Sequence, residues 1–375
     1  MRGLSGGRRT GPKPPGAAAR PAGPPAPPAA PALALAGVKL LAHRGRPVVR
    51  RTVCALVLPV LLGAFLHLFL YRGEAVTGLA PAMKSLWASG LLLQSGGARV
   101  VLECARFYMS LISKRILSDT YDLLDVMGPD EYHEHVKNNA YTNEMARMTL
   151  NYAVEVCQKY LPETDEAELM HFADAAKHLK HQTPDPKTGL IEQFDGYFKL
   201  ENVLVPEVRS RLIDPREYWG GAYGVAAQTQ VIKQADVIAL LYMLGQYPAD
   251  IIAANYDYYE PRTEHGSSLS ACMYALCACA IGRPAAAYPL FLKSAEADVV
   301  GGGKQWAGLV YIGGTHPAAA GGAYMVLLYG FLGLRFEDGK PTLHPRLPEG
   351  WKKVQMQVHW QGKDWLLTAE EGQQA

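Results

Sequence analysis

From residue 97 onward, apolar positions recur every three or four residues in stretches that are separated by polar, glycine-rich loops. This spacing places the apolar side chains on one face of an α-helix. The pattern predicts helices over residues 100–108, 145–156, 235–244 and 269–281. The loop at residues 189–219 is unusually long for a compact domain, which indicates a functional role. We therefore predict a mainly α-helical domain over residues 97–334, with chemistry in its polar loops.

After Gly333 the period of the pattern shortens to two, which is typical of β-strands. Strands are predicted at residues 335–336, 342–344, 354–360 and 365–369. The segments between them contain the turn-forming triplets Glu337-Asp338-Gly339, Pro348-Glu349-Gly350 and Gln361-Gly362-Lys363. Short strands with glycine-containing turns favour antiparallel pairing. We predict a small antiparallel β domain over residues 335–375.

The N-terminal part of the chain has a different composition. Residues 1–73 hold eleven of the 37 Lys and Arg residues and no Asp or Glu, so the net charge of +2 conceals a basic leader and a mildly acidic remainder. Pro, Gly and Ala dominate residues 1–35, and such a composition offers too little apolar surface to fold. We predict that residues 1–52 are disordered and that residues 72–96 form a linker. The near-neutral total charge argues against a nucleic-acid partner.

Residues 53–71 form a run of nineteen residues without Asp, Glu, Lys or Arg, flanked by Arg51 and Arg72. This run is long enough for a membrane anchor, but a buried core helix, or a segment that belongs to no working protein, stays open. The cysteines do not settle the location, although they stand in apolar helical contexts without CxxC pairs and are typical of small buried side chains in a reducing compartment. They are Cys54, Cys104, Cys157, Cys272, Cys277 and Cys279. We predict a cytoplasmic protein, with membrane anchoring as the alternative.

The densest polar cluster is Gly128-Pro129-Asp130-Glu131-Tyr132-His133-Glu134-His135, followed by Asn138, Asn139, Tyr141, Thr142 and Asn143. Carboxylates and amides suit sugar hydroxyls, aromatic faces cover sugar rings, and a carboxylic acid beside a second carboxylate suits general acid catalysis. Two alternatives remain open. In the first, Asp130 only caps the next helix and both histidines lie on the surface. In the second, His133 and His135 bind zinc, although no third ligand is evident nearby.

A second polar motif, His265-Gly266-Ser267-Ser268, precedes an apolar helical period. Hydroxyl groups and free N–H groups at a helix N-terminus can bind an anion, and His316 in Gly313-Gly314-Thr315-His316 adds an imidazole. The alternative is that one of the two serines only caps the helix. The stretch at residues 301–304, Gly-Gly-Gly-Lys, lacks the spacing of a nucleotide-binding P-loop.

The run GPDEYHEHVKNNAYTN resembles the signature loop of glycoside hydrolase family 65, the inverting α-glucoside phosphorylases that act on maltose, trehalose, kojibiose or nigerose. Five further blocks agree in order: residues 194–198, 231–237, 258–263, 265–270 and 330–334. The resemblance implies the C-terminal half of an (α/α)6 barrel, followed by the β domain. It makes Glu131 the general acid, with Lys233 and Gln234 holding the sugar. Asp130, Tyr132, His133 and Asn139 are further substrate-binding candidates, and His265, Ser267, Ser268 and His316 are the phosphate-binding candidates.

The resemblance also implies a reaction: inverting phosphorolysis of an α-glucosidic disaccharide to β-glucose 1-phosphate and a free sugar, with phosphate as co-substrate and neither metal nor organic cofactor. An inverting hydrolase needs a second carboxylate as base, and residues 299–336, where hydrolytic relatives carry it, contain no Asp or Glu. Glu260 and Glu264 keep hydrolysis open. Family members are much longer and commonly dimeric. We therefore expect a piece of a longer enzyme, and an inactive carbohydrate-binding remnant is the third alternative.

Overall fold

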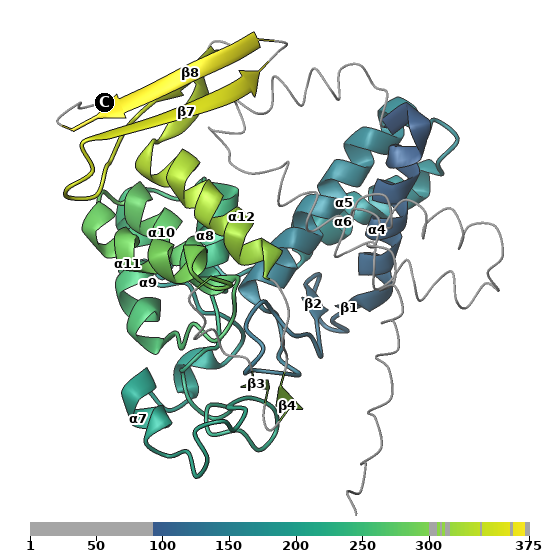
Figure 1. The fold of residues 1–375 in the computed structure, drawn as a ribbon. Helices are drawn as coiled ribbons and strands as arrows, with labels where there is room; N and C mark the ends of the chain where they lie inside the picture. Colours follow the sequence, from purple (N-terminus) through teal and green to yellow (C-terminus); the bar gives the residue numbers. More distant parts are fainter. Residues whose placement is uncertain are drawn as a thin grey trace, which may run out of the picture. The chain divides into compact units, whose positions relative to one another are not determined.

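The computed structural model describes residues 93–299, 306–307, 310–311, 316–337, 340–360 and 363–371 (Figure 1). The predicted leader, the apolar segment at residues 53–71 and most of the predicted linker lie outside these residues. The first described element is the π-helical segment Leu93–Gly97, which leads directly into helix α4 (Ala98–Leu111). Within the described part, no helix is both long and apolar enough to cross a membrane.

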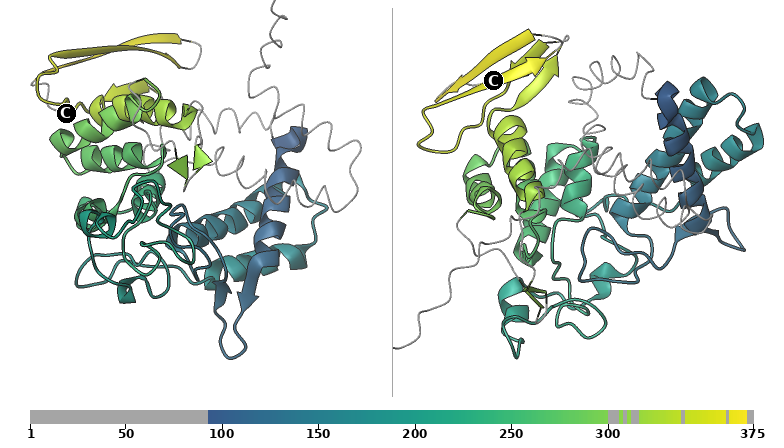
Figure 2. Two further views of the ribbon diagram at one scale, coloured as in Figure 1. Left: turned by 60° about the horizontal axis from the view of Figure 1, so that its bottom comes forward. Right: turned by 45° about the vertical axis from the view of Figure 1, so that its right-hand side comes forward.

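Helix α4 packs against two helices that follow it, α5 (Ala140–Tyr160) and α6 (Glu166–His178) (Figure 2). Their facing sides enclose an apolar cluster of Val101, Ala105, Leu150, Cys157 and Phe172, among others. Both later helices begin at side-chain caps, because Asn139 accepts a hydrogen bond from Thr142 N and Asp165 accepts one from Ala167 N. The predicted stripe over residues 100–108 is confirmed as helical, although Val100 itself is exposed.

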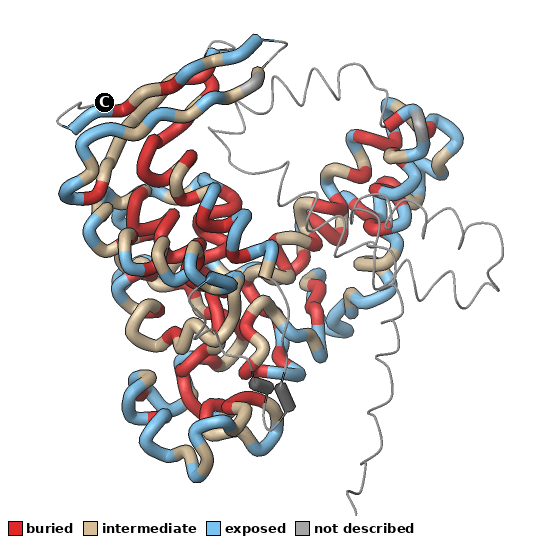
Figure 3. Tube along the Cα trace, in the orientation of Figure 1, coloured by how far each residue is buried: buried red, intermediate tan, exposed pale blue. Residues whose placement is uncertain are grey.

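Five further helices, α8 to α12, form the second and larger core. They are α8 (Val237–Leu244), α9 (Ala249–Tyr259), α10 (Ser270–Ala280), α11 (Pro284–Ala295) and α12 (Pro317–Met325). Every residue of α8 is buried, as are all residues of α10 except its last, and Figure 3 shows this buried band. The helices predicted from the apolar periods at residues 235–244 and 269–281 are therefore confirmed with small shifts at their ends.

Helices α10 and α12 run parallel to each other. A side chain at Gly322 would meet Cys272 Sγ at 2.5 Å, and one at Gly330, in the π-helical segment Val326–Phe331 that continues α12, would meet Cys279 Sγ at 3.0 Å. The contacts therefore advance in the same direction along both helices. Because the helices are parallel, the start of α12 lies at the same end as the start of α10.

The segments between the two helical groups are mostly loops. They include a hairpin of β1 (Ile112–Lys114) and β2 (Tyr121–Leu123), a 3-10 turn at Tyr197–Lys199 and the short helix α7 (Val205–Arg209). The long loop predicted at residues 189–219 is therefore present, interrupted only by these two short elements, and it continues to Asp236. This loop packs against the polar segment at residues 128–135 through a small apolar cluster that includes Tyr132, Val208 and Trp219.

The C-terminal strands form antiparallel hairpins, as predicted. Strand β5 (Leu334–Glu337) pairs with β6 (Lys340–Leu343), and β7 (Lys353–Trp360) pairs with β8 (Lys363–Glu370). A smaller hairpin joins β3 (Trp306–Ala307) and β4 (Val310–Tyr311). Gly333 has a φ of +60°, and a side chain there would collide with His344 O, so only glycine fits between α12 and the hairpins. The five cysteines in the described part are buried.

Candidate active site

Three polar segments that are far apart in the sequence meet, two through their backbones and the third through a side chain. Ile232 donates to Arg262 O over 2.8 Å, Glu264 donates back to Ile232 O over 2.8 Å, and Gly266 donates to Lys233 O over 3.0 Å. The same stretch is tied to the loop of the candidate acid, because Lys233 N donates to Asp130 Oδ1 over 2.8 Å. The predicted acid, the predicted sugar-binding pair and the His-Gly-Ser-Ser motif therefore lie side by side.

Glu131 and Lys233 form an ion pair at the surface of this arrangement. The Glu131 side chain is 42% exposed and that of Lys233 is 17% exposed, so the carboxyl group is open to a ligand while the ammonium group is enclosed. Tyr218 completes the group: its hydroxyl donates to Glu131 O over 2.7 Å, and Lys233 Nζ lies 5.5 Å from its ring centre. Sequence reasoning missed Tyr218, for which the adjacent Tyr218-Trp219 pair in a long loop was the only signal.

Asp130, by contrast, is fully enclosed and bonded on both oxygens. Oδ1 accepts from Tyr132 N over 3.1 Å and from Lys233 N over 2.8 Å. Oδ2 accepts from Gln193 Nε2 over 3.0 Å and lies 2.6 Å from His133 Nδ1. Asp130 therefore joins the backbones on either side of the Glu131–Lys233 pair. It does not cap the next helix, since Asn139 does, and that alternative is wrong.

His133 is buried beside Asp130, and His135 is exposed. Both ring nitrogens of His133 face acceptors, the second being Thr229 O at 2.8 Å. Burial opposes a proton on this ring, but the Asp130 charge and the hydrogen bonds to Asp130 and Thr229 O together raise the pKa of His133 above its usual value. His135 pairs instead with Asp125. The two histidines thus serve different partners, and the described residues hold no cluster of three or more metal-ligating side chains that would support the zinc alternative.

Asn139 and Asp236 extend the buried network behind the acid loop. Asn139 Nδ2 donates to both oxygens of Asp236, at 3.2 and 3.0 Å, and Asp236 Oδ2 accepts from Asp130 N over 3.2 Å. Burial, followed by the nearby Asp130 charge, raises the pKa of Asp236 to about 7. Tyr132 is buried too, with its ring stacked on Trp219 and its hydroxyl donating to Glu264 Oε2 over 3.1 Å. Four predicted substrate-binding residues are therefore bonded within the protein.

Two buried polar atoms near the Glu131–Lys233 pair have no partner within the described residues. Gln234 donates to Pro129 O through Nε2, but its Oε1 is unpaired. His265 Nδ1 lies 2.8 Å from Ser270 Oγ, and its Nε2 is unpaired. Burial lowers the pKa of His265 to about 3, so the ring is neutral at physiological pH. A ligand with hydroxyl or anionic oxygens would satisfy both atoms.

The two serines of the motif lie just before α10 without capping it through a side chain. The N-cap is Leu269, and Ser267 Oγ accepts only from Leu269 N, at 3.3 Å. His316 immediately precedes Pro317, the first residue of α12. Because α10 and α12 are parallel, the serines and His316 lie at the same end of the helical group. The predicted phosphate-binding residues are thus brought to one end of two helices whose first N–H groups point that way.

Asp298 is a further residue that sequence reasoning missed. Its Oδ1 lies 2.6 Å from His316 Nδ1, and its Oδ2 accepts from His316 N. The residue stands one position before the acid-free interval 299–336 that favoured phosphorolysis, so the structure does place a carboxylate beside His316. Glu260 and Glu264, the two other candidate bases, remain half-buried, and Glu264 is bonded to Tyr132.

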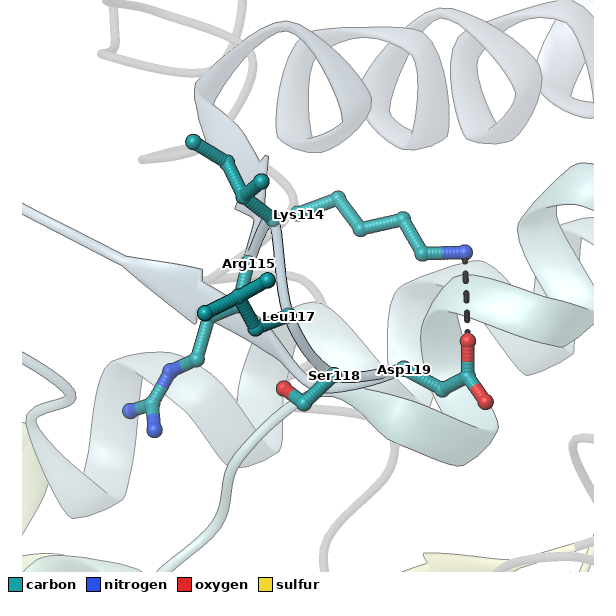
Figure 4. A pocket seen from close by; sticks show the side chains of 6 residues that line it. Lys114, Arg115, Leu117, Ser118 and Asp119 are labelled. Carbon is teal, nitrogen blue, oxygen red and sulfur yellow. Dashed lines mark ion pairs between the residues drawn. The ribbon is translucent and has the colours of Figure 1, made fainter.

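The described part of the chain also has two hollows, one away from this arrangement and one beside it. The first is an open depression at the tip of the β1–β2 hairpin, lined only by consecutive residues 114–119, where Lys114 and Asp119 form an exposed ion pair at 3.6 Å (Figure 4). The second, of about 240 Å³, lies between residues 132–136 and the loop around Gly221 and Gln228. It adjoins Tyr132 and His133 of the acid loop, whereas the first contains none of the candidate residues.

The chain belongs to glycosyl hydrolase family 65. Residues 89–325 match the family's central catalytic domain, and residues 334–372 match its C-terminal domain. The chain is 50% identical over 295 residues to nigerose phosphorylase of Lachnoclostridium phytofermentans, covering 75% of this chain and 39% of that protein. It is 39% identical over 267 residues to 1,2-alpha-glucosylglycerol phosphorylase of Bacillus selenitireducens, covering 68% and 35% respectively.

A solved structure named "Putative kojibiose phosphorylase from human microbiome" superposes with a TM-score of 0.66 at 24% identity. The match covers 76% of this chain and 42% of that one, and it concerns the fold alone. The chain therefore spans well under half the length of the relatives it matches.

Proposed function

We propose that the chain carries catalytic groups of an α-glucoside phosphorylase, which cleaves a disaccharide with phosphate, inverts the configuration at the anomeric carbon and releases β-glucose 1-phosphate with a free sugar. The observation that carries this proposal is a set of hydrogen bonds that brings three segments together. Backbone bonds join Lys233 and its neighbour to the loop of His265, and the Asp130 side chain joins Lys233 N to the loop of Glu131. The described helices would then form the C-terminal half of an (α/α)6 barrel, as the family resemblance implies.

Glu131 is the proton donor in this proposal. Its carboxyl group is the only one of the Asp130–Glu131 pair that reaches solvent, and its ion pair with Lys233 holds it at the edge of the site. Once Lys233 turns to a sugar hydroxyl, the Glu131 carboxylate is released from the ion pair and takes up a proton from solvent. As the glycosidic bond breaks, Glu131 gives this proton to the departing oxygen, while a phosphate oxygen supplies the electron pair to the anomeric carbon from the opposite face. The proton that hydrogen phosphate loses on forming the ester restores Glu131 through solvent.

Lys233 and Gln234 bind the glucosyl unit. The Lys233 ammonium can exchange the Glu131 carboxylate for a sugar hydroxyl, and Gln234 Oε1 is a buried acceptor without a partner in the described part of the chain. Asp130, Tyr132, His133 and Asn139 contribute to sugar binding indirectly, because their buried hydrogen bonds fix the loop that presents Glu131.

Phosphate is bound between the starts of α10 and α12 by Ser267, Ser268, His265 and His316. Uncharged hydroxyl donors together with helix N–H groups can stabilise a dianion without the cost of burying a permanent counter-charge, and a neutral imidazole can accept the hydrogen bond of the P–OH group of hydrogen phosphate. A phosphate nucleophile also needs no general base, which distinguishes this site from that of an inverting hydrolase.

The test is to incubate the purified full chain with nigerose, kojibiose, trehalose and maltose, each with and without inorganic phosphate, and to measure glucose and glucose 1-phosphate. The proposal predicts glucose 1-phosphate that forms only when phosphate is present. Free glucose released at the same rate without phosphate would establish hydrolysis instead. Sugar binding without any turnover would identify a carbohydrate-binding remnant. Asp257→Asn, which alters an exposed ion pair with Arg283, is the control variant and should behave as the wild type.

A further inference from the structure

Asp298 holds His316 at two points. The carboxylate lies 2.6 Å from Nδ1 of the ring through Oδ1, and through Oδ2 it accepts a hydrogen bond from the backbone N–H of the same residue. The two residues are 18 positions apart, Asp298 after the end of α11 and His316 directly before α12. A two-point contact of this kind fixes both the rotation of the ring and the start of the helix.

The contact also decides which ring nitrogen faces a ligand. An ionised carboxylate only accepts hydrogen bonds, so Nδ1 carries a proton whenever the contact is made. The hydrogen bonds from His316 keep the pKa of Asp298 below its usual value, which maintains the carboxylate as an anion. In the neutral ring Nε2 is then an acceptor, which can receive the hydrogen bond of the P–OH group of hydrogen phosphate, and its direction is set by the bond on the opposite side of the ring.

We propose that Asp298 is a positioning residue of the phosphate site: it fixes His316 so that Nε2 is presented to the phosphate nucleophile. The proposal rests on the assignment of His316 to phosphate binding in the proposed function. It deepens that assignment by naming a residue that acts on phosphate only through another side chain. Asp298 itself stays out of contact with phosphate, because two anions in direct contact would repel each other.

Hydrogen-bond geometry argues against Asp298 as the general base of a hydrolase. A general base must direct an oxygen at a water molecule, whereas each Asp298 oxygen is bonded to His316. The lowered pKa of Asp298 points the same way, since it makes the carboxylate a weaker base. The absence of Asp and Glu from residues 299–336 therefore still favours phosphorolysis over hydrolysis, even though the Asp298 carboxylate lies next to this interval.

The test compares Asp298→Asn with Glu296→Gln in the full chain. Glu296 stands two residues earlier at the C-terminal end of α11, is exposed, and loses the same charge when it is replaced. Asp298 is also exposed, so neither substitution threatens the fold. Asp298→Asn is expected to raise the KM for phosphate about ten- to hundred-fold, the usual effect of losing a charge-assisted hydrogen bond, and to leave the KM for the disaccharide unchanged. Glu296→Gln is expected to change neither.

A second readout is independent of turnover. Nuclear magnetic resonance of protein labelled with 15N-histidine reports the protonated nitrogen of each ring, and His316 is assigned by comparison with His316→Gln. We expect Nδ1–H in the wild type and in Glu296→Gln, and loss of this preference in Asp298→Asn. An unchanged tautomer, an unchanged KM for phosphate, or an equal rise in both KM values would each overturn the proposal. Absence of turnover in the wild type would instead count against the proposed function, while the tautomer would still test Asp298.

Discussion

Replacing Asp130 with Asn removes one charge and one acceptor from the centre of the buried network. The wild-type carboxylate meets four donors, two on each oxygen: Tyr132 N and Lys233 N on Oδ1, and His133 Nδ1 and Gln193 Nε2 on Oδ2. An amide presents its NH₂ group to one of these two pairs, whichever way it turns. The substitution therefore sets donors against donors and leaves His133 without its counter-charge.

The cost can be worked out from these contacts. Removing one partner of a buried, hydrogen-bonded ion pair destabilises a protein by about 3–5 kcal/mol. Asp130 and His133 meet that description, because their side chains are 0% and 3% exposed. We expect Asp130→Asn to lower the free energy of unfolding by about 3–5 kcal/mol, measured by urea denaturation with circular dichroism and tryptophan fluorescence as probes.

Asp257→Asn is the matched control, since it makes the same substitution at an ion pair whose side chains are 58% and 41% exposed. Pairs of that kind contribute only about 0–1 kcal/mol. If Asp130→Asn lost no more stability than this control, the buried hydrogen bonds of Asp130 would not stabilise the loop that carries Glu131. The claim that these bonds hold Glu131 next to Lys233 would then be refuted.

Three further predictions concern other parts of the molecule. The pKa of Asp236 is raised to about 7, so the folded protein keeps a proton on this residue that the unfolded chain releases above about pH 4. The contribution of Asp236 to the free energy of unfolding therefore falls as the pH rises from about 4 to 7, by up to ~1.4 kcal/mol per pH unit. Asp236→Asn should therefore gain stability relative to the wild type between pH 5 and pH 8 in urea denaturation, and an equal difference at both pH values would refute this. Gly322→Val should cost about 1–3 kcal/mol in the same assay because its side chain overlaps Cys272, and an unaffected midpoint would show that α10 and α12 pack differently. Glu131→Gln should slow disaccharide cleavage about 10²- to 10⁴-fold but spare α-glucosyl fluoride, whose leaving group needs no proton, and equal losses on both substrates would exclude the acid role.

Local features of this molecule could be predicted from its sequence. The apolar periods predicted α4, α5, α8 and α10, and the alternation after Gly333 predicted β5 to β8, because each pattern reflects which side of one element is buried. The start of α5 also follows a local rule, since Asn139 caps it through a hydrogen bond to a residue three positions away.

The contacts that make the site could not be predicted in this way. Tyr218 meets the backbone of Glu131 across 87 positions, and Lys233 meets its side chain across 102. Those meetings depend on the course of long loops without any periodicity, which only the tertiary structure reveals. Asp130 is an example. Its residue type and its sequence neighbours favoured binding to a sugar, whereas in the structure it is buried and hydrogen-bonded to protein groups.

The most direct test of the central claim is to follow the full chain with nigerose and inorganic phosphate by ¹H and ³¹P nuclear magnetic resonance. Inverting phosphorolysis predicts that β-glucose 1-phosphate and free glucose appear at equal rates and that neither forms without phosphate. The α-anomer of the phosphate ester, or glucose formed without any ester, would contradict the account.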